Sequence, residues 1–508
     1  MVHIMSPSLL AIAMVVVGFL WFYIHSRLTG AKKQPPGPRA LPVIGHLHLL
    51  GNLPHQSLAH LARKYGPLMS VKLGSKPTIV VSSPEAAELI LKTHDAVFAT
   101  RPKLISTDYI YYGAKGMGFT PYGSYWRNVR KLCTIHLLSG SKVESFAPMR
   151  RENLEMLIGS LRKSVGVSGV VDLTITLSEL VENITYKMVF GRIKDEEFDI
   201  KGLVAEGMCL AGAFNISDYV PYLRPLDLQG MERRLKAFSK EMDKLLEKIL
   251  NEHDQEDGEV KPRQDMDFID TLLSLMNQPM NSNDIEASSY LVDRTNIKGM
   301  LMDMVLGAFD SSATSVEWIF SELLRHPRVM KCLQEELESV IGMKRMVEET
   351  DLEKLNYLDM VIKETYRLHP VAPLLVPRES MEDIEIDRYH ILKNTRIIVN
   401  AWAIGRDPKV WSSNVNEFLP ERFGSRDIDL KGHHFQLLPF GSGRRGCAGM
   451  QLGLTTVRLI MAQLVHCFNW ELPNGMPPTD LDMTEKFGLS LPRANHLLAL
   501  PTSYRLLS

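Results

Sequence analysis

The chain has 508 residues, with 58 Lys and Arg against 59 Asp and Glu and 45% hydrophobic residues. This ordinary globular composition excludes a disordered, collagen-like or rod-like chain, and a formal net charge of −1 gives no basis for nucleic-acid binding. Five cysteines are too few, and one too many, for a fully paired disulfide framework, and no C-x-x-C motif is present, so a reducing compartment fits best.

An uncharged apolar run from Ser8 to Ile24 lies near the start of the chain. With two apolar residues ahead of it, the run approaches the roughly 20 residues that cross a bilayer as a helix. It is longer than a usual signal-peptide core, and no convincing cleavage site follows, so residues 1–26 are predicted to be an uncleaved membrane anchor. Basic residues follow the run but do not precede it, which places the rest of the chain in the cytosol.

Charge is distributed unevenly along the chain. Residues 1–84 hold eight of the 58 Lys and Arg and none of the 59 Asp and Glu, which leaves residues 85–508 at −9. A basic leader of this kind suits an anionic cytosolic leaflet. The alternative is a cleaved signal peptide on a secreted protein, and glycosylation at the sequons of Asn183 or Asn215 would favour it.

Residues 27–40 are predicted to be a basic, proline-rich hinge, because Pro35-Pro36-Gly37-Pro38 makes a stiff, non-helical spacer. Residues 41–508 are predicted to be one mainly α-helical domain with minor β-structure. Alternating patterns indicate a hairpin, with strands at 68–73 and 78–81, and strand-like segments over 377–403. Helices are predicted over 84–92, 123–138, 235–253, 296–324, 328–341, 352–368 and 450–466, and a surface loop over 254–267.

The strongest chemical signal is the segment 439–449, in which Cys447 follows a glycine-dense loop and precedes a predicted helix. Its sulfur should lie near free backbone N–H groups and the positive end of the helix dipole, beside Arg444 and Arg445. These features predict a lowered thiol pKa, which suits a nucleophile or a metal ligand. The glycines would let the loop approach a flat ligand closely.

Three interpretations of this loop compete. Gly441-x-Gly443-x-x-Gly446 satisfies the dinucleotide-binding pattern, but no Asp or Glu lies between Asp429 and Glu471, so the acid which that motif needs is missing. A cysteine nucleophile with a histidine base lacks a local signature. The third interpretation is a thiolate ligand to haem iron.

Residues Phe440 to Gly449 match the pattern F-x-x-G-x-R-x-C-x-G in full, and the segment therefore resembles the signature loop of the haem-thiolate cytochrome P-450 monooxygenases. With the anchor, the proline hinge and Pro420-Glu421-Arg422-Phe423, the chain resembles a plant A-type microsomal member. The resemblance implies the P-450 fold, with haem b (iron protoporphyrin IX) between a long distal helix and the helix after the cysteine loop. Cys447 would be the axial ligand of the iron, and Phe440, Gly443, Arg445 and Gly449 would shape the cofactor loop.

The remaining cysteines, Cys133, Cys209, Cys332 and Cys467, match no family role and are predicted to be small buried packing residues. His369 is predicted to be a helix-end or propionate-proximal residue rather than an iron ligand.

Glu364 and Arg367 share one helical face at i,i+3 spacing. By resemblance they are the E-x-x-R motif, which joins Arg422 in a buried network behind the haem. Trp126 and Arg130 lie one helical turn apart, and the resemblance assigns both to a haem propionate. Arg378 and Arg445 are assigned to the propionates as well.

The segment 307–314 is rich in Gly, Ser and Thr, which are poor residues for a helix interior. Either a local opening of the helix or packing through small residues would explain it. By resemblance this is the A-G-x-D-T segment, whose acid–alcohol pair delivers protons during oxygen activation; Asp310 and Ser311 occupy those places. Phe309 stands where many members have Thr, and Ser311 replaces the usual Thr, so Ser312 or Thr314 could share the alcohol's role.

The resemblance implies an NADPH- and O2-dependent monooxygenase in the endoplasmic reticulum membrane, a single-pass protein with a cytosolic catalytic domain and lipid contacts. Electrons would arrive from a separate NADPH–cytochrome reductase, with cytochrome b5 as an additional partner. Residues 430–470 contain no acid, and their Arg444, Arg445 and Arg458 are predicted to form a basic docking surface.

Family position places a set of largely apolar residues in the substrate pocket: Ile105, Tyr109, Phe214, Met304, Phe309, Leu374, Leu375 and Leu489. Such a lining selects a small hydrophobic substrate. A terpenoid is the preferred substrate class, and a phenylpropanoid or flavonoid aromatic is the alternative. A haem-thiolate isomerase or dehydratase and a non-catalytic haem-binding protein are further alternatives.

Overall fold

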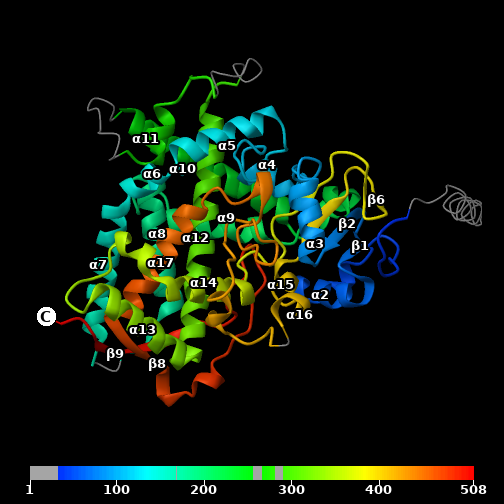
Figure 1. The fold of residues 1–508 in the computed structure, drawn as a ribbon. Helices are drawn as coiled ribbons and strands as arrows, with labels where there is room; N and C mark the ends of the chain where they lie inside the picture. The colour runs from blue at the N-terminus through cyan, green and yellow to red at the C-terminus, as the bar shows by residue number, and fades with distance from the viewer. Residues whose placement is uncertain (1–32, 167–168, 256–265, 281–289, 413, 508) are drawn as a thin grey trace, which may run out of the picture.

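The computed structural model describes residues 33–166, 169–255, 266–280, 290–412 and 414–507 (Figure 1). The predicted anchor over residues 1–26 and the first part of the hinge lie outside these ranges. Among the helices of the described ranges, none combines the length and the apolar character that a bilayer crossing requires.

Helices make up most of the molecule, as predicted. They are α2 (Pro54–Tyr65), α3 (Pro84–Glu88), α4 (Ile105–Ile110), α5 (Ser124–His136), α6 (Gly140–Ser145), α7 (Ala147–Ser164), α8 (Leu173–Phe190), α9 (Ile200–Gly212), α10 (Met231–Gln255), α11 (Phe268–Leu273), α12 (Arg294–Arg325), α13 (Pro327–Ile341), α14 (Asn356–Leu368), α15 (Ala401–Ile404), α16 (Pro408–Trp411) and α17 (Met450–Cys467). Short helical turns include η2 (Leu89–Thr93), η3 (Ile216–Asp218), η4 (Pro221–Leu226), η6 (Glu349–Lys354), η7 (Pro420–Phe423) and η8 (Gly443–Arg445).

The β-structure is minor, as predicted, and the hairpin is confirmed. Strands β1 (Leu68–Leu73) and β2 (Lys76–Val81) pair antiparallel, and β7 (Arg396–Val399) and β4 (Arg378–Glu379) complete a sheet of order β1-β2-β7-β4. A second sheet joins β3 (Val171–Asp172), β9 (Leu498–Tyr504) and β8 (Phe468–Glu471), and β5 (Ile384–Ile386) pairs with β6 (Tyr389–Ile391). In Figure 1 the first sheet lies at one end of the molecule with α2 and α3, while β8 and β9 lie with α7 and α13 at the other.

Helix α12 is the central element, with 32 residues and a length of about 48 Å. Asp293 begins it with a capping box, in which its side chain accepts a hydrogen bond from the Asn296 N–H. Apolar residues on all of its sides are buried, which is the pattern of a helix enclosed by others. It packs against α8, α17 and α14 and belongs to both of the largest hydrophobic clusters.

The helix predicted over 352–368 is confirmed only from Asn356 onward, because the chain forms η6 and α14 with a break at Leu355 (φ −93°, ψ 77°). The Glu348 side chain closes the first turn of η6. The first N–H groups of α14 are instead bonded by the Glu336 carboxylate of α13, at 2.6 Å from the Tyr357 nitrogen. This partner is distant in sequence, so local periodicity could not reveal the break.

The proline-rich hinge and the cysteines follow the predictions only in part. The described part of the hinge is non-helical, as predicted, but it is packed against β1: the Ser70 N–H donates to the Pro36 carbonyl at 2.8 Å.

Of the cysteines expected to be buried, Cys133 and Cys467 are buried, whereas Cys209 is exposed on α9 and the prediction is wrong for it. Cys332 is partly exposed.

Candidate active site

The cysteine loop is shaped by two glycines and one backbone hydrogen bond. Gly441 (φ 67°) and Gly443 (φ 68°) adopt the left-handed conformation that favours glycine. A Cβ atom on Gly443 would lie 2.4 Å from the Leu91 carbonyl oxygen, so this glycine allows the loop to pack against η2. The Cys447 N–H donates to the Phe440 carbonyl at 2.9 Å, which fixes the cysteine above the start of α17.

The Cys447 thiol has exposed surface, yet surrounding protein desolvates it and raises its pKa. Both observations hold if the sulfur faces an interior space. A Cβ atom built on neighbouring Gly449 meets no described atom within 4 Å, which agrees. This direction is opposite to the predicted lowering of the thiol pKa, because the Gly449 N–H and the Arg130 charge do not outweigh desolvation. A metal cation would supply the missing positive charge and hold the thiolate.

Four arginines are gathered beside this loop: Arg101, Arg130, Arg378 and Arg445. Burial, followed by repulsion from Arg378 and Arg130, lowers the pKa of Arg445 to about 9. Burial and the other three arginines lower the pKa of Arg101 well below its usual value. Asp95 compensates only part of this charge, through Arg378 at 2.6 Å. A cluster of guanidinium groups whose charge is only partly compensated fits an anionic ligand, and the two carboxylates of haem have that chemistry.

Backbone carbonyl groups hold these arginines in place. Arg445 donates to the carbonyl oxygens of Ala99 (2.6 Å), Met117 (3.3 Å) and Thr120. Arg101 donates to the Val376 carbonyl at 2.6 Å. The sequence did not identify Arg101, which follows the buried residues Phe98 and Ala99 and is itself buried.

Trp126 and Arg130 project from α5 toward the same group of residues. The Trp126 indole N–H donates to the Met117 carbonyl at 3.0 Å, and the Arg445 guanidinium lies 4.2 Å from the centre of the Trp126 ring. Arg130 donates to the Gly446 carbonyl at 2.8 Å, which ties α5 to the cysteine loop. The structure thus brings Trp126, Arg130, Arg378 and Arg445 together.

Residues 307–311 of α12 are exposed or partly exposed, whereas most of the helix is buried. Gly307 is exposed, and a Cβ atom there meets no described atom within 4 Å. The expected opening of the helix is not seen, because α12 continues unbroken through this segment. The Ser311 hydroxyl donates to the Gly307 carbonyl at 2.8 Å and the Ser315 hydroxyl to the Ser311 carbonyl at 2.7 Å, so both hydroxyls are satisfied within the helix.

Asp310 is held by a residue that the sequence did not identify. The Ser490 hydroxyl donates to Asp310 Oδ2, and the Ser490 hydroxyl oxygen lies 3.2 Å from that of Thr314. Burial raises the pKa of Asp310, while the hydrogen bonds from Ser490 lower it. Thr314 is therefore engaged with Ser490, and Ser312 is buried.

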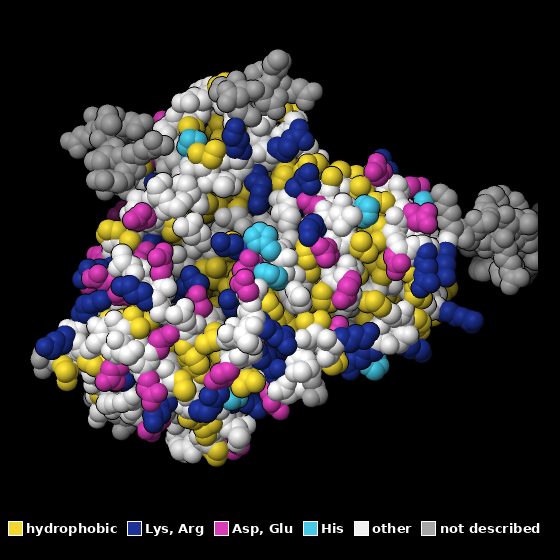
Figure 2. Space-filling model, viewed as in Figure 1, with side chains coloured by type: hydrophobic (Ala, Val, Ile, Leu, Met, Phe, Trp, Pro, Cys, Tyr) yellow, Lys and Arg dark blue, Asp and Glu magenta, His cyan; other side chains and the backbone are white. Residues whose placement is uncertain are grey.

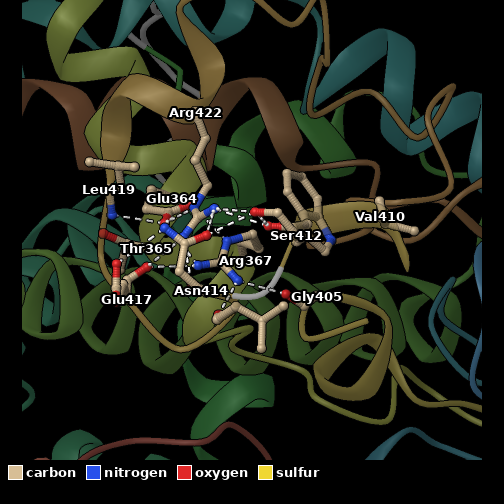
Figure 3. A network of polar contacts seen from close by, with 12 residues as sticks. Glu364, Thr365, Arg367, Gly405, Val410, Ser412, Asn414, Glu417, Leu419 and Arg422 are labelled. Carbon is tan, nitrogen blue, oxygen red and sulfur yellow. Dashed lines mark hydrogen bonds and ion pairs between the residues drawn. The ribbon is translucent and has the colours of Figure 1, made fainter. Parts of the chain in front are cut away.

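Glu364, Arg367 and Arg422 form one buried network (Figure 3). Arg367 donates to both carboxylate oxygens of Glu364, at 2.7 and 2.8 Å, and Arg422 donates to Glu364 at 3.0 Å. The arginines also bond the carbonyl oxygens of the segment between α15 and η7, including those of Gly405 (2.8 Å) and Asn414 (2.5 Å). The network therefore fastens α14 to the long segment that precedes the cysteine loop.

The predicted pocket residues separate into two groups. Ile105 and Met304 are buried in one hydrophobic cluster, against which Phe309 packs, and the backbone of Leu489 lies against Gly212 at the end of α9. Leu374 and Leu375 pack on the β-rich end.

Tyr109 and Phe214 each contact a residue outside the predicted pocket set. The Tyr109 hydroxyl donates to Glu232 of α10 at 2.9 Å, and the half-exposed Phe214 stacks on Tyr219 at 5.0 Å. Glu232 lines a partly open surface cavity of about 540 Å³ formed by η4 and α10, whereas Cys447 and Asp310 belong to other elements. Tyr109 also packs on the hydrophobic cluster that contains Ile105 and Met304. The pocket role of Tyr109 and Phe214 stays a prediction.

The predicted basic docking surface is wrong in part. Arg445 is buried, and Arg458 forms an ion pair with Asp359 at 2.7 Å. Arg444 is half exposed and contacts Asp95 at 3.1 Å. Acidic residues from other parts of the chain, Asp95 and Asp359, therefore lie beside this stretch in the folded protein.

His369 lies at the end of α14. Its Nε2 atom is 2.6 Å from the Glu322 carboxylate, and its ring stacks on Trp318 at 4.0 Å. These contacts support the helix-end alternative rather than a place beside a propionate.

A second acid on α12, Asp303, was also missed. Its carboxylate accepts hydrogen bonds from the backbone N–H groups of Met117 and Gly118. Burial raises the pKa of Asp303 to about 6, although these bonds oppose the rise. A Cβ atom on Gly116 would lie 2.0 Å from the carboxylate, so the close approach requires glycine there.

A helical fold with an interior cysteine, a buried arginine cluster and an acid–alcohol pair on the facing helix defines a haem-thiolate monooxygenase. The sequence matches the family model for cytochrome P450 over residues 35–500, and the chain belongs to that family. The family binds haem and generally receives electrons from a redox partner.

Several of its relatives are plant proteins. The chain is 54% identical over 505 residues to cytochrome P450 CYP736A12 of Panax ginseng, covering 99% of this chain and 100% of that protein. It is 41% identical to desmethyl-deoxy-podophyllotoxin synthase of Sinopodophyllum hexandrum, covering 92% of both chains, and 40% identical to premnaspirodiene oxygenase of Hyoscyamus muticus, covering 94% of both. Among solved structures, a zebrafish cytochrome P450 with progesterone matches with a TM-score of 0.73 and 25% identity, covering 89% of this chain and 99% of that one.

Proposed function

We propose that this protein hydroxylates a small hydrophobic metabolite, most consistently a terpenoid, at the expense of NADPH and O2. The observation that carries the proposal is the pairing of an interior-facing Cys447 with the bare stretch of α12 that bears Asp310 and Ser311. Haem, when bound, supplies the iron that activates O2. Cys447 would hold that iron, and the arginine cluster would bind the haem carboxylates.

The chain's own groups would manage the protons. Ser311 presents a hydroxyl whose own proton is directed to the Gly307 carbonyl, so its lone pairs are available to accept. Asp310 is partly buried, and this burial raises its pKa, as suits an acid that takes up and releases a proton. We assign proton delivery to this pair.

The preference for a terpenoid rests on the lining. Five of the eight predicted pocket residues are aliphatic, and Tyr109, Phe214 and Phe309 are aromatic. Such a lining suits an aliphatic skeleton better than a planar phenol, whose hydroxyls need polar partners. One relative is named premnaspirodiene oxygenase, and that name refers to a substrate with an aliphatic skeleton. The podophyllotoxin-type synthase supports the aromatic alternative.

A reconstituted assay tests this function. The protein, produced in microsomes with an NADPH–cytochrome reductase, is screened with sesquiterpene hydrocarbons and with phenylpropanoids by the haem spectral shift on binding and by product mass. We expect a product heavier by one oxygen atom that requires NADPH, and no product from Cys447→Ala. A product that forms without NADPH would overturn the proposal in favour of an isomerase or dehydratase.

The electron donor is proposed to bind a surface that differs from the predicted one. It consists of Arg127, Lys131 and Arg444. Arg127 and Lys131 are exposed one turn apart on the outer side of α5. Arg127 lies over the Tyr122 ring, and the Tyr122 hydroxyl also interacts with Arg444, so the three cations share one face beside the cysteine loop. An acidic patch on a reductase, or on cytochrome b5, would complement this surface.

The protein is proposed to be anchored in the endoplasmic reticulum membrane with its catalytic part in the cytosol. Exposed apolar residues near the N-terminus (Leu41, Val43) and around η4 (Leu226, Leu228) support a membrane contact. Their two segments both bond the β1–β2 turn: the Gly74 N–H donates to the Ile44 carbonyl and the Ser75 N–H to the Tyr219 carbonyl.

Membrane extraction tests this location. The full chain should resist extraction with alkaline carbonate and carry no glycan. The buried Asn215, whose side chain accepts a hydrogen bond from the Ser217 N–H, is a poor glycosylation site in any case. Glycosylation at Asn183 would overturn the cytosolic assignment.

A further inference from the structure

Ser490 belongs to the C-terminal part of the chain but lies against the middle of α12. It is 4% exposed. Its neighbour Leu491 is fastened on two sides: the Trp318 indole N–H donates to the Leu491 carbonyl at 2.7 Å, and the Leu491 N–H donates to the Val371 carbonyl at 3.0 Å. The position of Ser490 beside α12 is therefore fixed by the fold and does not depend on its own side chain.

The direction of the hydrogen bonds around Ser490 follows from proton counting. An ionised carboxylate only accepts, so the Ser490 hydroxyl donates its single proton to Asp310 Oδ2. At 3.2 Å from Ser490, the Thr314 hydroxyl must then be the donor to the Ser490 oxygen. Asp310 and Thr314 lie at i,i+4 on one face of α12, which lets a single serine bridge them. The result is a one-way chain from Thr314 through Ser490 to Asp310.

The acid and the alcohol of the proposed pair are held by different parts of the molecule. Ser311 is oriented by the carbonyl of its own helix, and Asp310 by a residue 180 positions away. The Ser490 backbone N–H also bonds Asp310, so this one residue opposes the desolvation of the carboxylate in two ways. Without it, a buried carboxyl would be free to rotate and would favour its neutral form.

We propose that Ser490 is the positioning residue for Asp310, and that Thr314 supports it by donating a hydrogen bond to the Ser490 oxygen. Use of the positioned proton in catalysis rests on the proposed function, whereas the positioning itself does not. The two parts are tested separately.

The first experiment measures the titration of Asp310 without turnover. Infrared difference spectra between acid and neutral pH are recorded on the purified protein, and the Asp310 carboxyl band is assigned with Asp310→Asn. Because Ser490→Ala removes a donor to the carboxylate, its titration midpoint should rise by about one to two pH units. Ser490→Thr keeps the hydroxyl and should keep the midpoint. An unchanged midpoint in Ser490→Ala would overturn the positioning role.

The second experiment measures coupling, with the hydrocarbon found in the microsomal screen as the probe. For variants with a normal absorption band of the reduced carbon monoxide complex, Ser490→Ala should release several-fold more hydrogen peroxide per NADPH than the wild type. Ser490→Thr should restore coupling. Thr314→Val leaves Ser490 in place and should have a smaller effect in the same direction.

These outcomes distinguish the two proposals. Coupling in Ser490→Ala equal to wild type, together with a shifted midpoint, would overturn the catalytic use of the positioned acid. A wild type that makes no NADPH-dependent product would instead sink the proposed function, while the titration still decides the positioning. If Ser490→Ala does not retain haem, Thr314→Val supplies the same comparison, and an unchanged midpoint there would overturn the directed chain.

Discussion

Glu364 has no exposed surface and is enclosed by two arginines and a backbone N–H group, so its charge is compensated only while all of these partners stay in place. Removing one member of such a buried group leaves the others unpaired. Glu364→Ala should destabilise the fold by about 3–5 kcal/mol and abolish haem incorporation. The absorption band of the reduced carbon monoxide complex reports the loss.

Glu421 is the matched control for that substitution, since it belongs to η7, as Arg422 does, but pairs with Arg328 at the exposed surface. Exposed pairs contribute at most about 1 kcal/mol, so Glu421→Ala should keep haem. A normal band in Glu364→Ala would refute the role of the network.

The acid–alcohol pair makes a second prediction at this scale. Asp310→Asn and Ser311→Ala should each lower product per NADPH by at least tenfold while peroxide release rises, because each removes a proton donor or relay. Ser321→Ala is the control, since that buried hydroxyl lies on the same helix and donates to the Glu317 carbonyl, away from the pair. Unchanged coupling in both active-site variants would contradict the assignment.

Sequence reasoning identified Cys447 and Glu364 because each is part of a short pattern with fixed spacing. It missed Arg101, Asp303 and Ser490, whose partners are separated from them by long stretches of chain. The direction of the Cys447 pKa shift was wrong for a related reason: local features favour the thiolate, but desolvation depends on everything packed around it.

At the scale of elements, the contact between Asp303 and the Met117–Gly118 backbone links α12 to the loop that precedes α5. The Met117 carbonyl in turn accepts hydrogen bonds from Trp126 and Arg445. In Asp303→Ala the amides of Met117 and Gly118 should exchange hydrogen at least tenfold faster, because they lose their acceptor.

Exchange measured by mass spectrometry on peptides of this loop checks the prediction. Asp303→Asn retains one oxygen acceptor and should show intermediate protection. Equal exchange in wild type and Asp303→Ala would show that the loop is held by other contacts.

The end of α10 and the start of α11 are joined by a buried histidine. His253 lies 2.9 Å from Asp267 through Nε2 and 2.8 Å from the Ile249 carbonyl through Nδ1, with Asp270 at 4.0 Å. Burial lowers the pKa of His253, but the hydrogen bond and charge of Asp267 outweigh it, and the net pKa is raised above 6.5.

Because the folded-state pKa is raised, the stabilisation is fully present below about pH 6.5 and is lost as pH rises through the folded pKa. A charge-assisted hydrogen bond of this kind contributes about 1.5–3 kcal/mol. The apparent unfolding temperature of the wild type should fall above that pKa, and His253→Gln should remove this part of the pH dependence. An identical pH profile in His253→Gln would contradict the assignment.

For the molecule as a whole, Lys and Arg side chains are interspersed with Asp and Glu on the face shown in Figure 2, so net charge alone does not locate a partner. The proposed docking surface is instead local. Arg127→Glu combined with Arg444→Glu should slow reduction by the reductase about tenfold at low salt, with less difference at high salt.

Stopped-flow reduction at several salt concentrations measures this effect. Lys240→Glu, an exposed change on α10, is the control. Rates that do not depend on salt in the wild type would count against electrostatic docking.

The overall architecture was predictable because long helices such as α12 bury one or more complete faces, and burial leaves a pattern in the sequence. The β1–β2 hairpin was predictable from its turn. The short turns and breaks were not, as Glu336 shows: a carboxylate from α13 begins α14, and so determines where the helix bearing Glu364 starts.

The arginine cluster has a consequence for how the protein accumulates in a cell. Arg101, Arg378 and Arg445 are buried, and with Arg130 they repel one another. A dianionic cofactor that binds only the folded chain would stabilise it by mass action. The yield of folded protein should therefore track the supply of haem during synthesis, so that cofactor biosynthesis limits the abundance of the enzyme as well as its activity.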